Sequence, residues 1–178
     1  MKKLFLINLL GLVILGSFFS CNKKETTTTP TTTVEITVKD GNSWTSSNTT
    51  MNIVSGATIN IYDTQTDIIN NSTPKYTATT DQSGKASIPV EFKTQYFFTI
   101  QKGNAKNVIN GLLIIGIFQT QAEIQSSPNQ TPTPSIGSPK FLDANGDGII
   151  RNPQDNVYGD FIDLIQNKTV AKTSIVYQ

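Results

Sequence analysis

Oxygen-bearing side chains alternate along one short segment of this chain, residues 143–148, in a spacing that suits a calcium ion. Asp143, Asn145 and Asp147 occupy positions one, three and five of the segment, and Gly148 occupies position six. A calcium loop needs this spacing because the backbone must curl until alternate oxygens converge on one ion. The carbonyl of Ile149 at position seven is the expected fourth ligand. The segment predicts a calcium site, and the alternative is an Asx- and Gly-rich turn that holds no ion.

The second half of the loop departs from the calcium pattern. Position twelve, where a carboxylate is usual, is Gln154, and a carboxylate follows one place later at Asp155. An extra residue near Pro153 would still bring Asp155 to the ion, so which of the two residues completes the site stays open. Over its first eight positions the segment resembles the loops of dockerins and EF-hand proteins, which implies calcium in a structural role. Dockerins generally use two such loops, so cohesin binding is not implied.

β-Strands are the elements that must position this loop, because apolar and polar residues alternate through much of the chain. A period of two predicts a strand with one buried face. It recurs at residues 34–38, 57–62, 76–78, 86–90 and 96–100. Gly84 is suited to the turn before the fourth stretch, because glycine readily adopts a positive φ. Pro89 lacks an N–H group, so the fourth stretch is expected at the edge of a sheet.

Three motifs in this region resemble one family of domains. They are SGATINIYD, KYTATTDQSGKASIPV and QYFFTIQKG, within about residues 53–103. These motifs are similar to those of carboxypeptidase-regulatory-like domains, which share a transthyretin-like sandwich. The resemblance implies a mainly β fold, an Ig-like or transthyretin-like β-sandwich with the calcium loop and a short helix as a C-terminal insertion. It also implies an accessory domain without a catalytic site of its own.

Two further elements are expected in the second half of the chain. Residues 111–125 are strongly apolar, and their glycines and β-branched residues predict a buried central strand that continues by alternation through Thr120, Ala122 and Ile124. After the calcium loop, Asn152 can cap a helix whose apolar residues recur at helical spacing: Val157, Phe161, Leu164 and Ile165. A last strand is expected over residues 169–177.

The only cysteine of the chain, Cys21, follows its only long apolar run. Lys2 and Lys3 precede an uncharged run over residues 4–19, as in a secretory signal. This order resembles the lipoprotein signals of Bacteroidota-type bacteria, which implies cleavage before Cys21 and acylation of its thiol. The run of 16 residues is shorter than the ~20 that span a bilayer. An uncleaved membrane anchor and an ordinary signal peptide are the alternatives.

The chain therefore divides into a signal peptide at 1–20, the lipidated Cys21 with a threonine-rich linker at 21–33, and one β-sandwich domain at 34–178. This domain includes the calcium loop at 143–155. Removal of Lys2 and Lys3 with the signal changes the formal net charge from +1 to −1. No basic patch remains to favour nucleic acid as a partner. The expected location is the cell envelope, as an outer-membrane lipoprotein that faces the periplasm or the cell surface.

The residues offer little for catalysis. The chain has no histidine, which is the commonest general base, and Asp160 and Asp163 are expected to be solvated on a helix face. We therefore expect a non-catalytic envelope protein that binds or scaffolds, with the membrane and an envelope protein or glycan as partners. The alternative is a glycan-binding module or a weak glycan-processing protein that uses Trp44. A Trp44 folded over the sandwich edge is the simpler interpretation.

Overall fold

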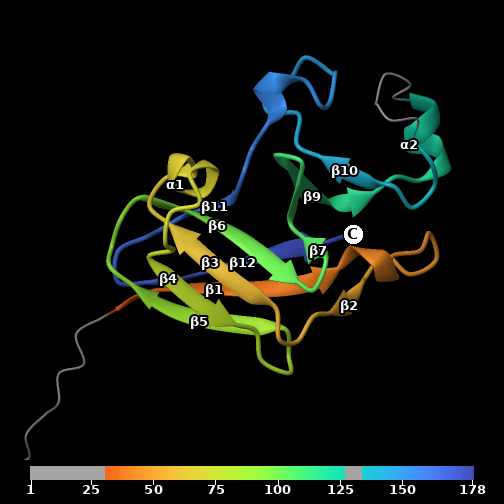
Figure 1. Ribbon diagram of the computed structural model, residues 1–178. Helices are drawn as coiled ribbons and strands as arrows, with labels where there is room; N and C mark the ends of the chain where they lie inside the picture. Colours follow the sequence, from red (N-terminus) through yellow and green to blue (C-terminus); the bar gives the residue numbers. More distant parts are fainter. Residues whose placement is uncertain (1–30, 127–133) are drawn as a thin grey trace, which may run out of the picture.

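Two β-sheets face each other across one apolar core (Figure 1). The computed structural model describes residues 31–126 and 134–178. The first sheet has the strand order β5–β1–β12, with β2 also paired to β1. The second sheet has the order β11–β6–β3–β4, with β7 also paired to β6. A small third sheet has the order β10–β9–β8.

The strands of the described residues have these bounds: β1 Thr32–Asp40, β2 Asn52–Ile53, β3 Thr58–Tyr62, β4 Tyr76–Thr79, β5 Lys85–Val90, β6 Gln95–Lys102, β7 Ala105–Lys106, β8 Val108–Ile109, β9 Leu112–Phe118, β10 Pro139–Phe141, β11 Asp160–Asp163 and β12 Thr169–Val176. The helices are short: α1 Gln65–Ile69, α2 Gln121–Ser126, and the 3-10 turns η1 Gly41–Ser43 and η2 Pro153–Asp155. The chain is thus mainly β, as the alternation predicts.

The main core lies between the first two sheets and is built from alternate residues of their strands. In β1 every second side chain is fully buried, and the same alternation runs through β5 and β6. The largest fully buried side chains of this core include Tyr96, Phe98, Ile36 and Ile59. Burying side chains of this size stabilises the fold by roughly 1.5–3 kcal/mol each. The five stretches predicted as strands from their period of two are confirmed.

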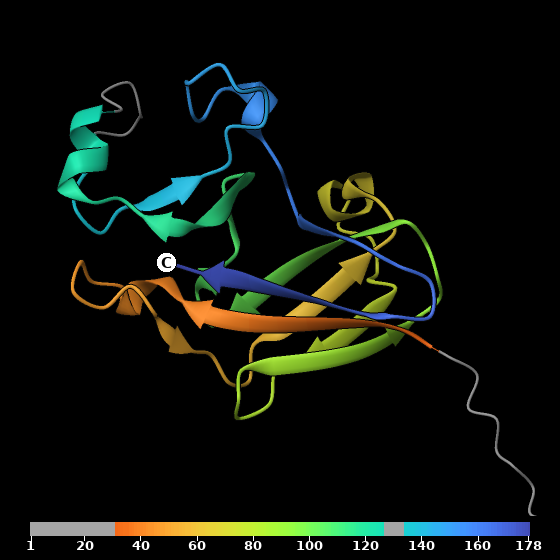
Figure 2. The same cartoon turned by 180° about the vertical axis from the view of Figure 1, so that it is seen from behind.

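The first and last strands of the sandwich, β1 and β12, lie side by side and run parallel. Their register extends from Thr33 opposite Thr169 to Asp40 opposite Val176. The long arrows of β1 and β12 are adjacent in both views (Figure 2). A parallel pair needs a crossover connection, and here everything between residues 40 and 169 provides it. The last strand, predicted at 169–177, is confirmed.

Strand β5 forms the outer edge of the first sheet, as Pro89 predicts. Val34 lies opposite Ile88 and Ile36 lies opposite Ala86, and the N–H of Val38 donates to the carbonyl of Gly84 at 2.8 Å. The even-numbered backbone groups of β1 therefore point toward β5, and Pro89 presents its side without N–H outward. A proline at such a position blocks the pairing of another strand. Gly84 adopts a φ of 72°, as expected for the turn before β5.

A second apolar cluster lies between the small sheet and one end of the first sheet. We call it the second cluster, and its buried members are Trp44, Leu112, Ile114, Phe118, Phe141 and Ile175. Phe118 is fully buried. Its ring stacks on Trp44 with centroids 5.6 Å apart and meets Tyr177 at 5.4 Å. This cluster holds the small sheet against the sandwich.

Two expectations for the second half of the chain are wrong. The strand that begins at Leu112 ends at Phe118, and Thr120, Ala122 and Ile124 belong to helix α2 and its cap instead of a continued strand. The cause is a capping box, in which the hydroxyl of Thr120 accepts the N–H of Glu123 and the carboxylate of Glu123 accepts the N–H of Thr120. Strand β9 is central to the small sheet, and it lies outside the sandwich.

The expectation of a helix after the predicted calcium loop is also wrong. Asn152 does cap a turn, and its side chain accepts N–H groups from Gln154 and Asp155. The turn covers only Pro153–Asp155, and strand β11 follows it and pairs with β6. Pairing with β6, which makes β11 an edge strand of the second sheet, outweighs the helical spacing of the apolar residues Val157, Phe161, Leu164 and Ile165. Among the helices in the described part of the chain, none is long and apolar enough to cross a membrane.

Candidate functional site

The predicted calcium loop is a curled turn held by its own side chains. Both carboxylate oxygens of Asp143 accept backbone N–H groups, Oδ1 from Gly146 at 2.7 Å and Oδ2 from Gly148 at 2.9 Å. Gly146 and Gly148 have φ values of 73° and 78°, which only glycine adopts without strain. The glycines thus allow the backbone to wrap around the carboxylate of Asp143. This is the local curl that the alternating oxygens predict.

The next oxygen side chains in the loop are tied to an asparagine amide. Asp147 accepts the N–H of Ile149 through Oδ1 at 2.7 Å, and Asn145 accepts the N–H of Asp147 at 3.0 Å. The Nδ2 group of Asn152 donates to Oδ2 of Asp147 at 3.0 Å and to the carbonyl of Ile149 at 3.1 Å. One NH2 group therefore bridges two of the predicted calcium ligands. A cation at this position would have to displace it.

Asp155 lies against the beginning of the loop, and Gln154 does not. The side chain of Asp155 is fully buried, and its Oδ1 accepts the N–H of Ala144 at 3.1 Å. Its second oxygen, Oδ2, has no hydrogen-bond partner among the residues that the structure describes. A buried carboxylate oxygen without a partner destabilises the fold, because it has lost its hydration and gained no hydrogen bond. Gln154 is exposed, so the two residues left open by the sequence differ in their access to the loop.

The carboxylates of the loop do not converge in the conformation described here. Within residues 31–126 and 134–178, no three carboxylate, histidine or cysteine side chains gather closely enough to hold a metal ion. Asp143, Asp147 and Asp155 therefore lie around the loop without meeting at one point. Their remaining lone pairs, the side-chain oxygen of Asn145 and the carbonyl of Ile149 are the oxygen ligands that calcium prefers. The donor set fits the ion, and closure of the loop around it requires a local rearrangement.

The loop is connected to the second cluster through the residues that follow its acidic half. Ile150 packs against that cluster. The guanidinium of Arg151 lies over the ring of Phe141, 4.7 Å from its centroid. Burial lowers the pKa of Arg151 from its ordinary value, although the group stays charged at neutral pH. A change in the conformation of the loop would therefore alter its contacts with the small sheet.

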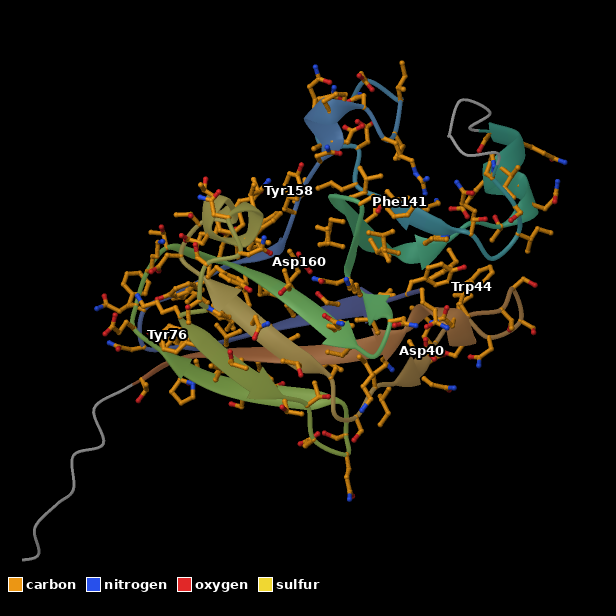
Figure 3. The ribbon with its side chains drawn as sticks, viewed as in Figure 1. Asp40, Trp44, Tyr76, Phe141, Tyr158 and Asp160 are labelled. Carbon is orange, nitrogen blue, oxygen red and sulfur yellow. The ribbon has the colours of Figure 1, made fainter. Side chains whose placement is uncertain are left out.

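Trp44, the candidate sugar-stacking residue, is packed inside the second cluster (Figure 3). The exposed fraction of its side chain is 8%. One face of the indole stacks on Phe118, and a β-carbon placed on Gly137 would lie 3.8 Å from Cζ3 of the indole. A hollow of about 610 Å³ passes beside it, lined also by Thr49, Thr120 and Glu123. The indole offers no broad free face on which a sugar ring could stack.

A buried polar cluster that the sequence did not predict lies between β11 and β12. Asp160 is 4% exposed. Its Oδ1 lies 2.6 Å from Nζ of Lys172, and its Oδ2 accepts the hydroxyl of Ser174. The expected helix placed Asp160 and Asp163 together in solvent. In the strand, Asp163 is exposed and bonds Gln95 at 2.8 Å, whereas Asp160 points inward. No local sequence signal marks this cluster, because its partners are 12 and 14 residues away.

The lipidation site predicted at Cys21 lies outside the described residues. No family model matches the chain, and no curated protein matches it. The fold therefore defines this chain only as a mainly β protein with a sandwich-like arrangement of sheets.

Proposed function

We propose that this chain is a lipid-anchored, non-catalytic envelope protein whose sandwich, of the Ig-like or transthyretin-like type, binds or scaffolds and is stiffened by a calcium ion. The signal at residues 1–21 supports the anchor, because a charged start, an apolar run and a cysteine follow one another in the order that lipoprotein signals use. Neither the glycan-binding alternative nor a catalytic role gains support from the packed position of Trp44.

The observation that carries the stiffener role is the buried Oδ2 of Asp155, which has no partner among the described residues. Asp143, Asn145, Asp147 and Asp155, with the carbonyl of Ile149, are the residues that would hold the ion. Calcium would supply a positive charge that satisfies oxygens left without protons or donors. The ion would join Asp155 to the opposite side of the loop. Because Ile150 packs on the second cluster, the same ion would tie down the edge of the small sheet.

Thermal unfolding of the full chain with calcium and with a chelator tests this role. Extracellular calcium modules bind with dissociation constants of about 10⁻⁴ to 10⁻³ M, so about 10 mM calcium stabilises by roughly 1.4–2.7 kcal/mol. For a domain of this size the melting temperature should rise by about 3–10 °C. Magnesium at the same concentration should shift it less, because Mg²⁺ demands a stricter octahedral site.

Asp155→Asn is the informative variant, because it keeps the size of the side chain and an acceptor for Ala144 while removing the charge. The calcium-dependent shift should disappear in this variant. Asp163→Asn is the matched control, because Asp163 is exposed and lies outside the loop, and it should retain the shift. An equal melting temperature in calcium and chelator, or an undiminished shift in Asp155→Asn, contradicts the stiffener role.

The anchor has a separate test. Mass spectrometry of the protein from bacterial membranes should find a diacylglycerol-modified N-terminal peptide that begins at Cys21. Cys21→Ser should move the protein from the membrane fraction to the soluble one. An unmodified peptide that still contains Lys2 and Lys3 would rule out the lipid anchor.

A further inference from the structure

The edge of strand β12 carries backbone groups that have no partner within the fold. The N–H of Thr33 donates to the carbonyl of Lys168 at 3.0 Å. In a parallel ladder this bond determines which backbone groups of β12 face β1. The N–H and C=O groups of the even-numbered residues bond to β1, and those of the odd-numbered residues point away from it. Among the odd residues, Tyr177 exchanges two backbone bonds with Lys106, at 2.9 and 3.0 Å. Strand β7 thus pairs, through Lys106, with only the last residue of this edge.

The three preceding odd residues, Ala171, Thr173 and Ile175, leave their N–H and C=O groups unpaired among the residues that the structure describes. This row alternates donors and acceptors with the repeat of a strand, and only another extended backbone matches it. The opposite edge of the same sheet is blocked by Pro89 of β5. Strand β12 contains no proline, so the first sheet is blocked at one edge and open at the other.

A cleft runs along this open edge. In both views β12 lies beneath β9 (Figures 1 and 2), and β11 also lies against β12. Between them is a cavity of about 250 Å³, lined by residues 172–175 of β12 and 113–116 of β9 together with Leu142, Asp160 and Phe161. A cavity of roughly 150 Å³ accommodates benzene, so this one has room for a large apolar side chain. We call it the β12 cleft.

The walls of the β12 cleft define the side chains that suit it. The side toward β9 is apolar, with Leu113, Ile115 and Leu142. Ile115 is 44% exposed and Phe161 is 37% exposed, which leaves apolar surface uncovered at the mouth. The side toward β11 is polar but has no net charge, because Asp160 and Lys172 form an ion pair. A charged ligand would lose its hydration there without gaining a free counter-ion.

We propose that the β12 cleft binds an extended, uncharged peptide segment of a partner protein, which adds a strand to the open edge of the first sheet. Its backbone pairs with Ala171 and Thr173, which are exposed, and ends beside Ile175, which is buried in the second cluster. Side chains on one face of the segment are apolar and enter the cavity toward β9, and those on the other face are small hydroxyl residues toward Asp160. Strand addition of this kind takes its affinity from main-chain bonds and its specificity from alternate pockets. The inference gives a partner class to the binding role proposed above and does not depend on calcium.

The probe is an acetylated and amidated heptapeptide of alternating threonine and valine, added to the isotopically labelled full chain in detergent. Hydrogen exchange measured by NMR should slow at the amides of Ala171 and Thr173 by at least tenfold when the peptide is present. Amides of β5 should not change, because Pro89 blocks that edge. The matched probe is the same sequence with every second amide N-methylated, which keeps the side chains and removes the pairing, and it should give no protection.

Thr173→Pro tests the edge from the protein side. The N–H of Thr173 takes no part in the ladder with β1, so the variant should fold. Its affinity for the peptide should fall by about tenfold or more. Thr173→Val is the control, because it keeps the N–H group, and it should bind as the parent chain does. If Thr173→Pro fails to fold, the comparison of the plain and N-methylated peptides still decides the question.

Three results would overturn the proposal. One is the absence of protection at about 1 mM peptide, and another is equal protection by the N-methylated peptide. The third is slow exchange at Ala171 and Thr173 in the free chain, since the edge would then already be covered. Sedimentation would show whether a second copy covers it, and deletion of residues 22–30 would show whether the threonine-rich segment does. These outcomes concern binding at β12 and leave the calcium and anchor tests unaffected.

Discussion

The substitution Gly41→Ala tests how rigidly the second cluster is packed. A β-carbon on Gly41 would lie 2.3 Å from Cζ of Phe118, 3.0 Å from its Cε2 and 3.1 Å from Cγ2 of Ile175. Phe118 cannot retreat, because its ring is fully buried between Trp44 and Tyr177. Overpacking of this kind costs about 1–3 kcal/mol, and the loss of glycine entropy in the unfolded state offsets about 0.4–1 kcal/mol. The middle of these two ranges gives a net destabilisation of about 1.3 kcal/mol.

Gly159→Ala is the matched control for this effect. Its β-carbon would also meet an atom at 2.3 Å, but that atom is Cδ1 of Ile68, the far end of a flexible side chain in α1, and the nearest backbone atom is the carbonyl oxygen of Phe98 at 3.2 Å. Ile68 can rotate away, so this substitution should be less destabilising than Gly41→Ala by about 1 kcal/mol. Neither glycine has a positive φ, so backbone strain does not enter the comparison.

Urea unfolding followed by tryptophan fluorescence is the assay. Trp44 is the only tryptophan of the chain and lies on the ring of Phe118, so it reports directly on the second cluster. The double variant with Phe118→Leu removes the clashing atom and should recover about 1–2 kcal/mol relative to the sum of the single variants. Equal stability of Gly41→Ala and the parent chain, or strict additivity in the double variant, would refute the packing argument.

Three other predictions concern single polar groups. Thr80→Val should destabilise by about 1–3 kcal/mol, because the buried hydroxyl of Thr80 accepts one backbone N–H and donates to one backbone carbonyl. Asp160→Asn should destabilise by about 1–3 kcal/mol in urea unfolding, because it leaves the half-buried Lys172 without its counter-ion. The hydrogen bond from Lys140 holds the pKa of Glu123 below its ordinary value of 4.5. The ionised Glu123 therefore contributes its full stabilisation of the fold above pH 4.5, and this contribution is lost as the pH falls through the lowered pKa.

Each of these predictions has a control and a contradicting result. Thr79→Val, at the exposed neighbouring position, should change stability little, and an equal loss at both positions would contradict the role of the buried hydroxyl. The Asp163→Asn variant serves the same purpose for Asp160. For Glu123, the stabilities of the parent chain and Glu123→Gln should differ at neutral pH and converge in acid. A difference that persists unchanged at low pH would show that charge is not its cause.

Much of the sandwich is predictable from local sequence because its strands bury one face. Val34, Ile36 and Val38 alternate with polar residues, and all three are fully buried in β1. Strand β11 is different, since it places Asp160 on its buried face and Phe161 on its exposed face. That arrangement is stable only because Lys172 and Ser174 meet Asp160 from β12. A contact of this kind has no trace in the local pattern, so the segment resembled a helix.

Helix α2 and the predicted calcium loop show two other limits of sequence-based prediction. The spacing of Thr120 and Glu123 is a capping-box signal and could have located the helix, but the apolar run before it favoured a longer strand. In the loop, the curl around Asp143 follows from the spacing of its oxygens and glycines. Of the two candidate residues, Asp155 is buried against the loop and Gln154 is exposed, and this difference is set by how η2 packs. The spacing of residues in the sequence therefore cannot show which of the two lies against the loop.

The parallel pairing of β1 and β12 determines how the sandwich would respond to tension. The Thr32 end of β1 and the Val176 end of β12 lie at opposite ends of one ladder. A force that pulls these two ends apart acts along the strands, so the backbone bonds between them share the load and must break together. Rupture then depends on the rate of forced unfolding and not on equilibrium stability. A chain held at its N-terminal end and pulled at its C-terminal end would resist extension through the backbone hydrogen bonds between β1 and β12.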